Sequence, residues 1–139
     1  MAEKIVQTAG RDQLGEFAPM FAHLNDDVLF GEVWNEEAID VKTKCIITVV
    51  SLMASGITDS SLSYHLRNAK AHGVTKEEIA AIITHATMYV GWPKGWAVFR
   101  LAKEVWNETT DEDMEALKNV EHIKDYGEHG FFPVFGGKM

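Results

Sequence analysis

Two successive helices are indicated by residues 75–99, TKEEIAAIITHATMYVGWPKGWAVF. Thr75 followed three residues later by Glu78 has the spacing of a capping box, in which each side chain bonds the backbone N–H of the other residue. Apolar residues then recur at helical spacing up to Val90, and Gly91 suits the left-handed conformation that often ends a helix. This pattern predicts a helix with a well-marked beginning and end.

Helices are expected along most of the remaining chain as well. Each is marked by a capping side chain at its start, or by a glycine or proline at a boundary. The expected helices run from Asp40 to Ser55 with Gly56 as the stop, from Asp59 to Gly73, from Pro93 to Trp106, and over residues 109–123. The one serious strand candidate, the β-branched residues 46–50, lies inside the first of these. The sequence therefore predicts an all-α fold.

The two ends of the chain carry less regular patterns. Apolar residues at helical spacing near the N-terminus are interrupted by Pro19, which predicts a kink or break; they are Leu14, Phe17, Phe21 and Leu24. Asp26 and Asp27 are candidate N-caps for a second helical turn. Residues 127–139 contain four Gly and one Pro, which exclude a regular helix, and three Phe, which favour burial on this domain or on a neighbouring subunit.

Composition limits the class of protein. The 139 residues, 46% of them hydrophobic, suit one domain over residues 1–139, with residues 28–107 as its core and residues 108–139 as a C-terminal helix and Phe- and Gly-rich tail. A net charge of −8 disfavours nucleic acid and anionic membrane surfaces as partners. The N-terminus shows no apolar signal region, and the longest apolar run is too short to cross a bilayer. We expect a soluble, cytoplasmic protein.

Two histidines are candidates for chemistry. His65 lies on the apolar stripe of its helix with Leu62, Leu66 and Ala69, so we expect it to be buried. His85 lies at the edge of the next helix's apolar stripe, where we expect it half-buried, with Tyr89 one turn on. A pair of imidazoles in a dry cleft can move protons or polarise a carbonyl. A satisfied core histidine is the structural alternative, and the His spacing does not indicate a metal site.

Three segments resemble the carboxymuconolactone decarboxylase family, in its 4-carboxymuconolactone decarboxylase branch. They are FGEVW at residues 30–34, HLRNAKAHGVTKEEI at residues 65–79 and ITHATMYVGWPKGWAVF at residues 83–99. The resemblance implies an all-α fold of the alkyl hydroperoxide reductase D type. It also implies a homo-oligomer, a trimer or a ring-shaped hexamer, with sites near subunit contacts.

The other branch of that family uses a thiol pair, in a motif of glutamate followed by CxxCxxxH. When the motif's histidine is placed on His65, its two cysteines fall on Thr58 and Ser61. Hydroxyl groups cannot replace a thiolate and a resolving thiol in a disulfide relay. The lone Cys45 lies among apolar residues, which favours a small core residue over a redox group.

The resemblance therefore implies a decarboxylase that acts without a cofactor on a small unsaturated lactone acid. His65 and His85 are the candidate catalytic residues, and Arg67 is the candidate clamp for a carboxylate of the anionic substrate. The other candidate substrate-binding residues are Glu32, Tyr89 and Trp92. Each has a structural alternative: an ion pair of Arg67 with Glu77 or Glu78, a solvated Glu32, a core Tyr89, and packing or subunit contact for Trp92. A peroxide-linked thiol protein and a non-catalytic ligand-binding oligomer are the alternative functions.

Overall fold

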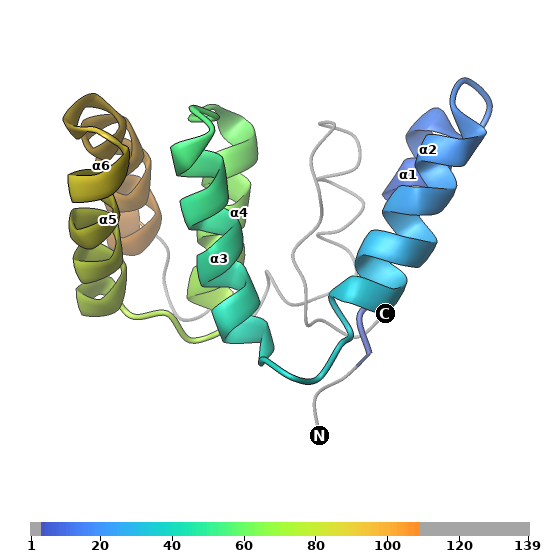
Figure 1. Cartoon of the computed structure of the whole chain (residues 1–139), viewed down its shortest axis with the longest axis horizontal. Coiled ribbons are helices and arrows are strands. Elements are labelled where there is room, and N and C mark those ends of the chain that lie inside the picture. The colour runs from blue at the N-terminus through green and yellow to red at the C-terminus, as the bar shows by residue number, and fades with distance from the viewer. Residues whose placement is uncertain (1–3, 109–139) are drawn as a thin grey trace.

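The computed structural model describes residues 4–108, and these residues form helices without any strand. Figure 1 shows them as two groups joined by a turn. The helices are α1 (Ala9–Leu14), α2 (Pro19–His23), the π-helix η1 (Leu24–Val33), α3 (Val41–Ala54), α4 (Ser60–Ala71), α5 (Lys76–Val90) and α6 (Trp92–Glu108). The all-α prediction is confirmed. The expected helix over residues 109–123 and the tail over residues 127–139 lie outside the described residues.

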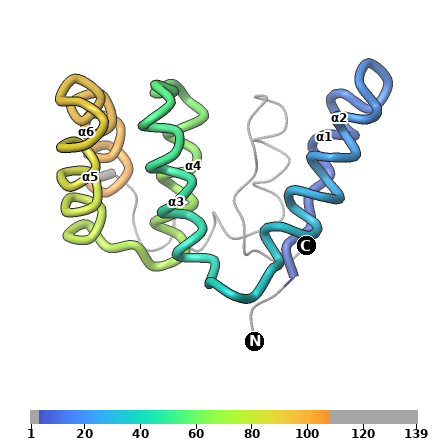
Figure 2. The backbone as a smooth tube through the Cα atoms, in the orientation of Figure 1, coloured from blue at the N-terminus to red at the C-terminus, as the bar shows by residue number. Residues whose placement is uncertain are grey.

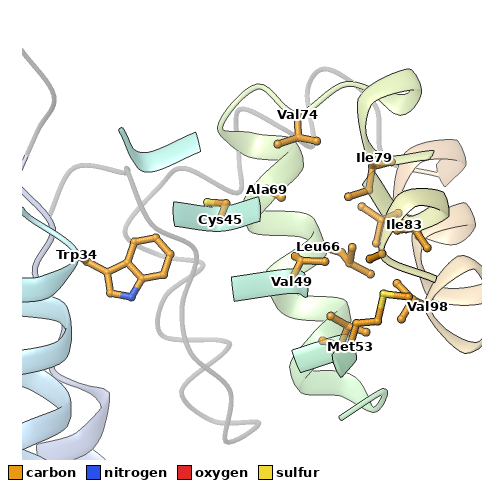
Figure 3. Close-up of a cluster of buried hydrophobic side chains, with 14 of the residues drawn as sticks. Trp34, Cys45, Val49, Met53, Leu66, Ala69, Val74, Ile79, Ile83 and Val98 are labelled. Carbon is orange, nitrogen blue, oxygen red and sulfur yellow. The ribbon is translucent and has the colours of Figure 1, made fainter. Parts of the chain in front are cut away.

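Helices α3 to α6 form a bundle. Helix α3 packs on α4, α4 packs on α6, and α5 packs on α6 and α3. The side chains between them are apolar and almost fully buried (Figure 3). They include Val49 and Met53 from α3, Leu66 and Ala69 from α4, Ile79 and Ile83 from α5, and Val98 from α6. The bundle therefore holds the helices that carry both candidate histidines.

The capping residues expected from the sequence begin three of these helices. The Asp40 carboxylate accepts the Thr43 N–H at 2.8 Å, and the Asp59 carboxylate accepts the Ser61 N–H at 2.9 Å. Thr75 and Glu78 form the reciprocal capping box, with contacts of 3.0 and 2.9 Å. These side chains satisfy backbone donors that a helix cannot satisfy internally.

Helices α1, α2 and η1 form the second group, which the backbone trace in Figure 2 shows apart from the bundle. The break expected at Pro19 is confirmed, because α1 ends before it and α2 begins at it. Phe17 lies in the intervening turn and is 90% exposed, while Phe21 and Leu24 are also exposed. The apolar stripe of this segment therefore faces outward in the isolated chain.

Neither Asp26 nor Asp27 caps a following helix as the sequence suggested, because both lie inside η1. The chain enters η1 at Leu24 without a break, so Asp26 lies inside a helical segment and its carboxylate is directed at α1. That carboxylate is buried and accepts the N–H groups of Gly10 and Arg11, both at 2.9 Å. Asp26 thus satisfies the N-terminal donors of a helix that precedes it by about fifteen residues.

We expect Asp26→Ala to lower the free energy of unfolding by about 2–3 kcal/mol, because it leaves buried N–H groups without an acceptor. Asp27→Ala is a matched control. The Asp27 carboxylate is exposed and contacts Arg11 and His23 at the surface, where water screens such pairs and they contribute little to stability. Urea unfolding of both variants measures the two effects. Equal losses would show that the buried contacts of Asp26 do not hold this segment together.

Candidate active site

His65 is buried in the bundle, as its place on the apolar stripe of α4 predicted. His65 is 7% exposed, and the centroids of the Tyr64 and His65 rings are 6.1 Å apart. Burial lowers the pKa of His65 to about 4, because desolvation disfavours the charged imidazolium. At neutral pH the ring is therefore uncharged, with one nitrogen able to donate a hydrogen bond and the other able to accept one.

Arg67 lies on the same helix but on a different face. Each residue of an α-helix is rotated by about 100° from the last, so the side chains of His65 and Arg67 leave α4 about 200° apart. Arg67 is half-buried and takes part in no ion pair within residues 4–108. Glu78, one of its expected surface partners, binds Lys42 at 3.1 Å instead. The guanidinium thus has no carboxylate partner among the described residues.

His85 and Tyr89 are brought together on α5. Their ring centroids are 5.3 Å apart, and both line a shallow apolar cavity of about 560 Å³ with residues of α3 and α5. His85 is exposed in the isolated chain, and Tyr89 is 80% exposed. The expectation of a half-buried His85 is therefore wrong for one copy of the chain, because only α5 and one residue of α3, Val50, border this cavity.

Trp92 lines a separate cavity of about 220 Å³ between α5 and α6. Its walls are mainly aromatic and apolar, and they are formed by Thr84, Thr87, Met88, Trp92, Gly95, Trp96 and Phe99. Gly95 permits the close approach of the two helices here, since a Cβ atom on it would clash with Oγ1 of Thr87. Trp92 and Trp96 remain exposed at the rim.

Glu32 lines a third cavity, of about 480 Å³, at the turn between η1 and α3. The same cavity contains Lys44, a residue that sequence reasoning did not single out. Lys44 is 9% exposed, and its ammonium donates to the carbonyl oxygens of Trp34, at 3.0 Å, and Glu36. Lysine is seldom buried, and Lys42 and Thr43 precede Lys44 in the same helix, so the sequence alone did not indicate this position.

The candidate residues are thus distributed within one copy of the chain. His85 and Tyr89 share one cavity, while Trp92 and Glu32 each line another. Neither His65 nor Arg67 is among the residues lining these three cavities. The cleft expected to be shared by His65 and His85 is therefore not one of them, and it stays a prediction. No cluster of three or more His, Cys, Asp or Glu side chains within residues 4–108 is arranged to hold a metal ion.

Comparison with known proteins identifies the relatives of this fold. The model of the carboxymuconolactone decarboxylase family matches residues 19–104, which include η1, α3, α4 and α5 and most of α6. The chain belongs to this family. The match includes all six candidate residues, from Glu32 to Trp92.

Two individual relatives support the membership. A 4-carboxymuconolactone decarboxylase of Acinetobacter baylyi is 32% identical over 97 residues, which cover 70% of this chain and 72% of the relative. A Paracoccus denitrificans protein described as an uncharacterized 15.0 kDa protein in the nqo9-nqo10 intergenic region is 30% identical over 111 residues, covering 79% and 74%. None of the described helices is both long and apolar enough to cross a membrane.

Within this family a thiol mechanism requires a reactive cysteine, and Cys45 does not have the properties of one. It is buried on α3, and the Asn68 side-chain amide donates to its Sγ at 3.7 Å. Burial, and secondarily the negative charge of Asp40, raise the pKa of the Cys45 thiol to about 12. A thiol with this pKa is almost entirely protonated at neutral pH and is a poor nucleophile.

We expect Cys45 in the folded protein to react with a thiol reagent about 1,000-fold more slowly than in the unfolded chain, because a pKa three units higher lowers the thiolate fraction by that factor. Labelling with a chromogenic disulfide at pH 7, with and without urea, measures both rates. Rapid labelling of the folded protein would contradict the buried, protonated state and would return the thiol-redox function to consideration.

Proposed function

We propose that this protein is a cofactor-independent decarboxylase of a small unsaturated lactone acid. The observation that carries the proposal is a buried, uncharged imidazole at His65 in a family member that lacks the thiol pair. The relationship to the A. baylyi 4-carboxymuconolactone decarboxylase supports the reaction class. The raised pKa and burial of Cys45 weigh against the peroxide-linked alternative.

The substrate itself supplies the electron sink for this reaction. The bond between the ring carbon and its carboxylate breaks, and the electron pair passes through the conjugated double bond to the lactone carbonyl oxygen, giving a dienolate and CO₂. The dienolate then takes a proton at the ring carbon beside the carbonyl. The protein must therefore bind an anion, donate a hydrogen bond where the oxygen gains charge, and deliver one proton to carbon.

The candidate residues divide these tasks. His65 donates a hydrogen bond to the lactone carbonyl oxygen, a role that suits an uncharged imidazole in a dry environment. His85, next to Tyr89, delivers the proton to carbon. Arg67 binds a carboxylate, because it has no carboxylate partner among residues 4–108. Glu32 and Trp92 orient or enclose the substrate.

A homo-oligomer would cover apolar surface that one copy of the chain leaves open to water. Large apolar side chains are exposed at both ends of the protomer. Their apolar surface is larger than a monomer usually exposes to water. They include Phe17, Met20 and Phe21 in the second group and Met88, Tyr89, Trp92 and Trp96 on α5 and α6. We therefore propose a trimer or hexamer whose subunit contacts cover these surfaces, and sedimentation velocity would contradict it by finding a folded monomer.

Release of CO₂ from 4-carboxymuconolactone by the purified full-length protein tests the proposed function. The saturated lactone acid 5-oxotetrahydrofuran-2-carboxylate is the matched control, since it has the carboxylate but no conjugated electron sink. We expect CO₂ from the unsaturated acid alone. If a panel of related lactones and β-keto acids also gives none, while a ligand still binds, the protein is a non-catalytic binding oligomer.

A further inference from the structure

We propose that Lys44 binds the substrate's carboxylate in the cavity between η1 and α3. This inference rests on the proposed function only for the class of ligand, a small organic acid. It assigns the anion contact to a residue that lies outside the motifs discussed above, and it adds to Arg67 a second, more deeply buried cation. Glu32, a candidate from the sequence, lines the same cavity.

The hydrogen bonds of Lys44 leave its positive charge uncompensated. Its Nζ donates to the backbone carbonyl oxygens of Trp34 and Glu36, which are neutral acceptors. Among residues 4–108, no carboxylate oxygen forms an ion pair with Nζ within 4.0 Å. An ammonium group has three N–H donors, so one donor remains within residues 4–108 in addition to the charge. A buried cation in this state attracts an anion strongly, because water screens it poorly.

The cavity has the size and the walls of a small-molecule site. Its volume of about 480 Å³ lies within the range of about 300–1,000 Å³ that is common for ligand pockets. Most of its wall is apolar, with the side chains of Leu29, Val33, Trp34, Ile39 and Ile47. Thr48 also lines it, and its hydroxyl is held by a 2.8 Å hydrogen bond to the Lys44 carbonyl oxygen. An apolar lactone ring with one carboxylate matches this combination.

Two acidic residues at the cavity limit what it can take. Glu32 and Glu36 are exposed, and the Glu36 carboxylate accepts the Ala38 N–H at 2.9 Å. Their charges are screened by water, whereas that of Lys44 is shielded from it. The cavity is therefore suited to an acid that places one carboxylate at Lys44 and keeps any second carboxylate away from Glu32 and Glu36.

Calorimetric titration with 5-oxotetrahydrofuran-2-carboxylate tests the inference on the full-length protein, because this acid binds without reacting. We expect Lys44→Met to weaken its binding about 30-fold or more, as removal of one partner from a buried charge pair typically does. Lys42→Met is the matched control: it removes the same charge from the same helix, but Lys42 pairs with Glu78 at the surface. We expect Lys42→Met to bind within about twofold of wild type.

A second variant leaves the Lys44 contacts in place and fills the cavity instead. Ile47 lines the cavity and is about half exposed, so the larger side chain of Ile47→Trp can extend into the cavity without displacing the core. We expect Ile47→Trp to exclude the acid while keeping the helical circular dichroism spectrum. If Lys44→Met fails to fold, Ile47→Trp still shows whether the acid binds in this cavity. Equal binding by wild type and by a folded Ile47→Trp protein would overturn the inference.

The uncharged lactone γ-butyrolactone shows whether the carboxylate matters. We expect this lactone to bind far more weakly than the acid. Equal affinity for the two compounds would overturn the inference. Unchanged affinity of a folded Lys44→Met protein for the acid would also overturn it.

The experiments distinguish failure of this inference from failure of the proposed function. Binding through Lys44 without any CO₂ release would refute the decarboxylase function alone, whereas CO₂ release with unchanged binding by Lys44→Met would refute this inference alone.

Discussion

His65→Leu is expected to lower kcat about 100-fold or more with little change in KM. Leucine fills a similar volume but removes both ring nitrogens, and loss of one hydrogen bond to a developing oxyanion typically costs a factor of about 100–1,000 in kcat. His65→Gln keeps a donor in a less fixed position, so we expect an intermediate rate. Steady-state rates of CO₂ release for the three proteins measure this order.

Unfolding of the same three proteins in urea separates a chemical role from a structural one. If His65 acts on the substrate, turnover falls far more than the change in stability explains. A Leu variant that keeps its turnover but loses several kcal/mol of stability would show that His65 is a structural core residue. The site would then have to be sought around Arg67 and Lys44.

Acid is expected to destabilise the protein through His65 by about 2–3 kcal/mol between pH 7 and pH 4.5. The pKa of His65 is about 4 in the folded chain, against about 6.5 for a histidine exposed to water, so below pH 6.5 the unfolded chain binds the extra proton. The stability that comes from the uncharged ring is therefore complete above pH 6.5 and is lost as the pH falls towards 4. Each unit of pKa difference corresponds to about 1.4 kcal/mol.

Urea unfolding of wild type and His65→Gln at pH 7.5 and pH 4.5 measures this contribution as a difference. Asp27, Asp40 and Glu78 also have lowered pKa values, through hydrogen bonds to Arg11, Thr43 and Thr75 respectively, but they are present in both proteins and cancel. We expect wild type to lose the larger amount of stability in acid. An identical loss in both proteins would mean that His65 is not held uncharged by burial.

The sequence predicted the bundle well because its boundaries are encoded locally. Asp40, Asp59 and the Thr75–Glu78 box each act on an N–H two or three residues away, so the spacing alone reveals them. Burial of His65 followed equally from the apolar stripe of one helix.

Contacts between distant segments could not be read in this way. Asp26 has the sequence pattern of an N-cap, but its partners Gly10 and Arg11 lie fifteen or sixteen residues earlier in the chain. Lys44 looks like a surface residue until the turn before α3 brings two carbonyl oxygens to its ammonium. The pattern around His85 indicated an apolar stripe without saying whether this chain or another copy covers its edge.

Proton and carbon NMR of 4-carboxymuconolactone incubated in D₂O with the purified protein tests the central claim most directly. If the protein decarboxylates the lactone acid through a dienolate, one molecule of CO₂ appears for each lactone consumed. At early times the product carries one deuterium on the ring carbon beside the carbonyl. We expect His65→Leu to slow the formation of CO₂ and of this deuterated product by the same factor. Consumption of the lactone by ring opening without CO₂, or no reaction with wild type, would contradict the claim.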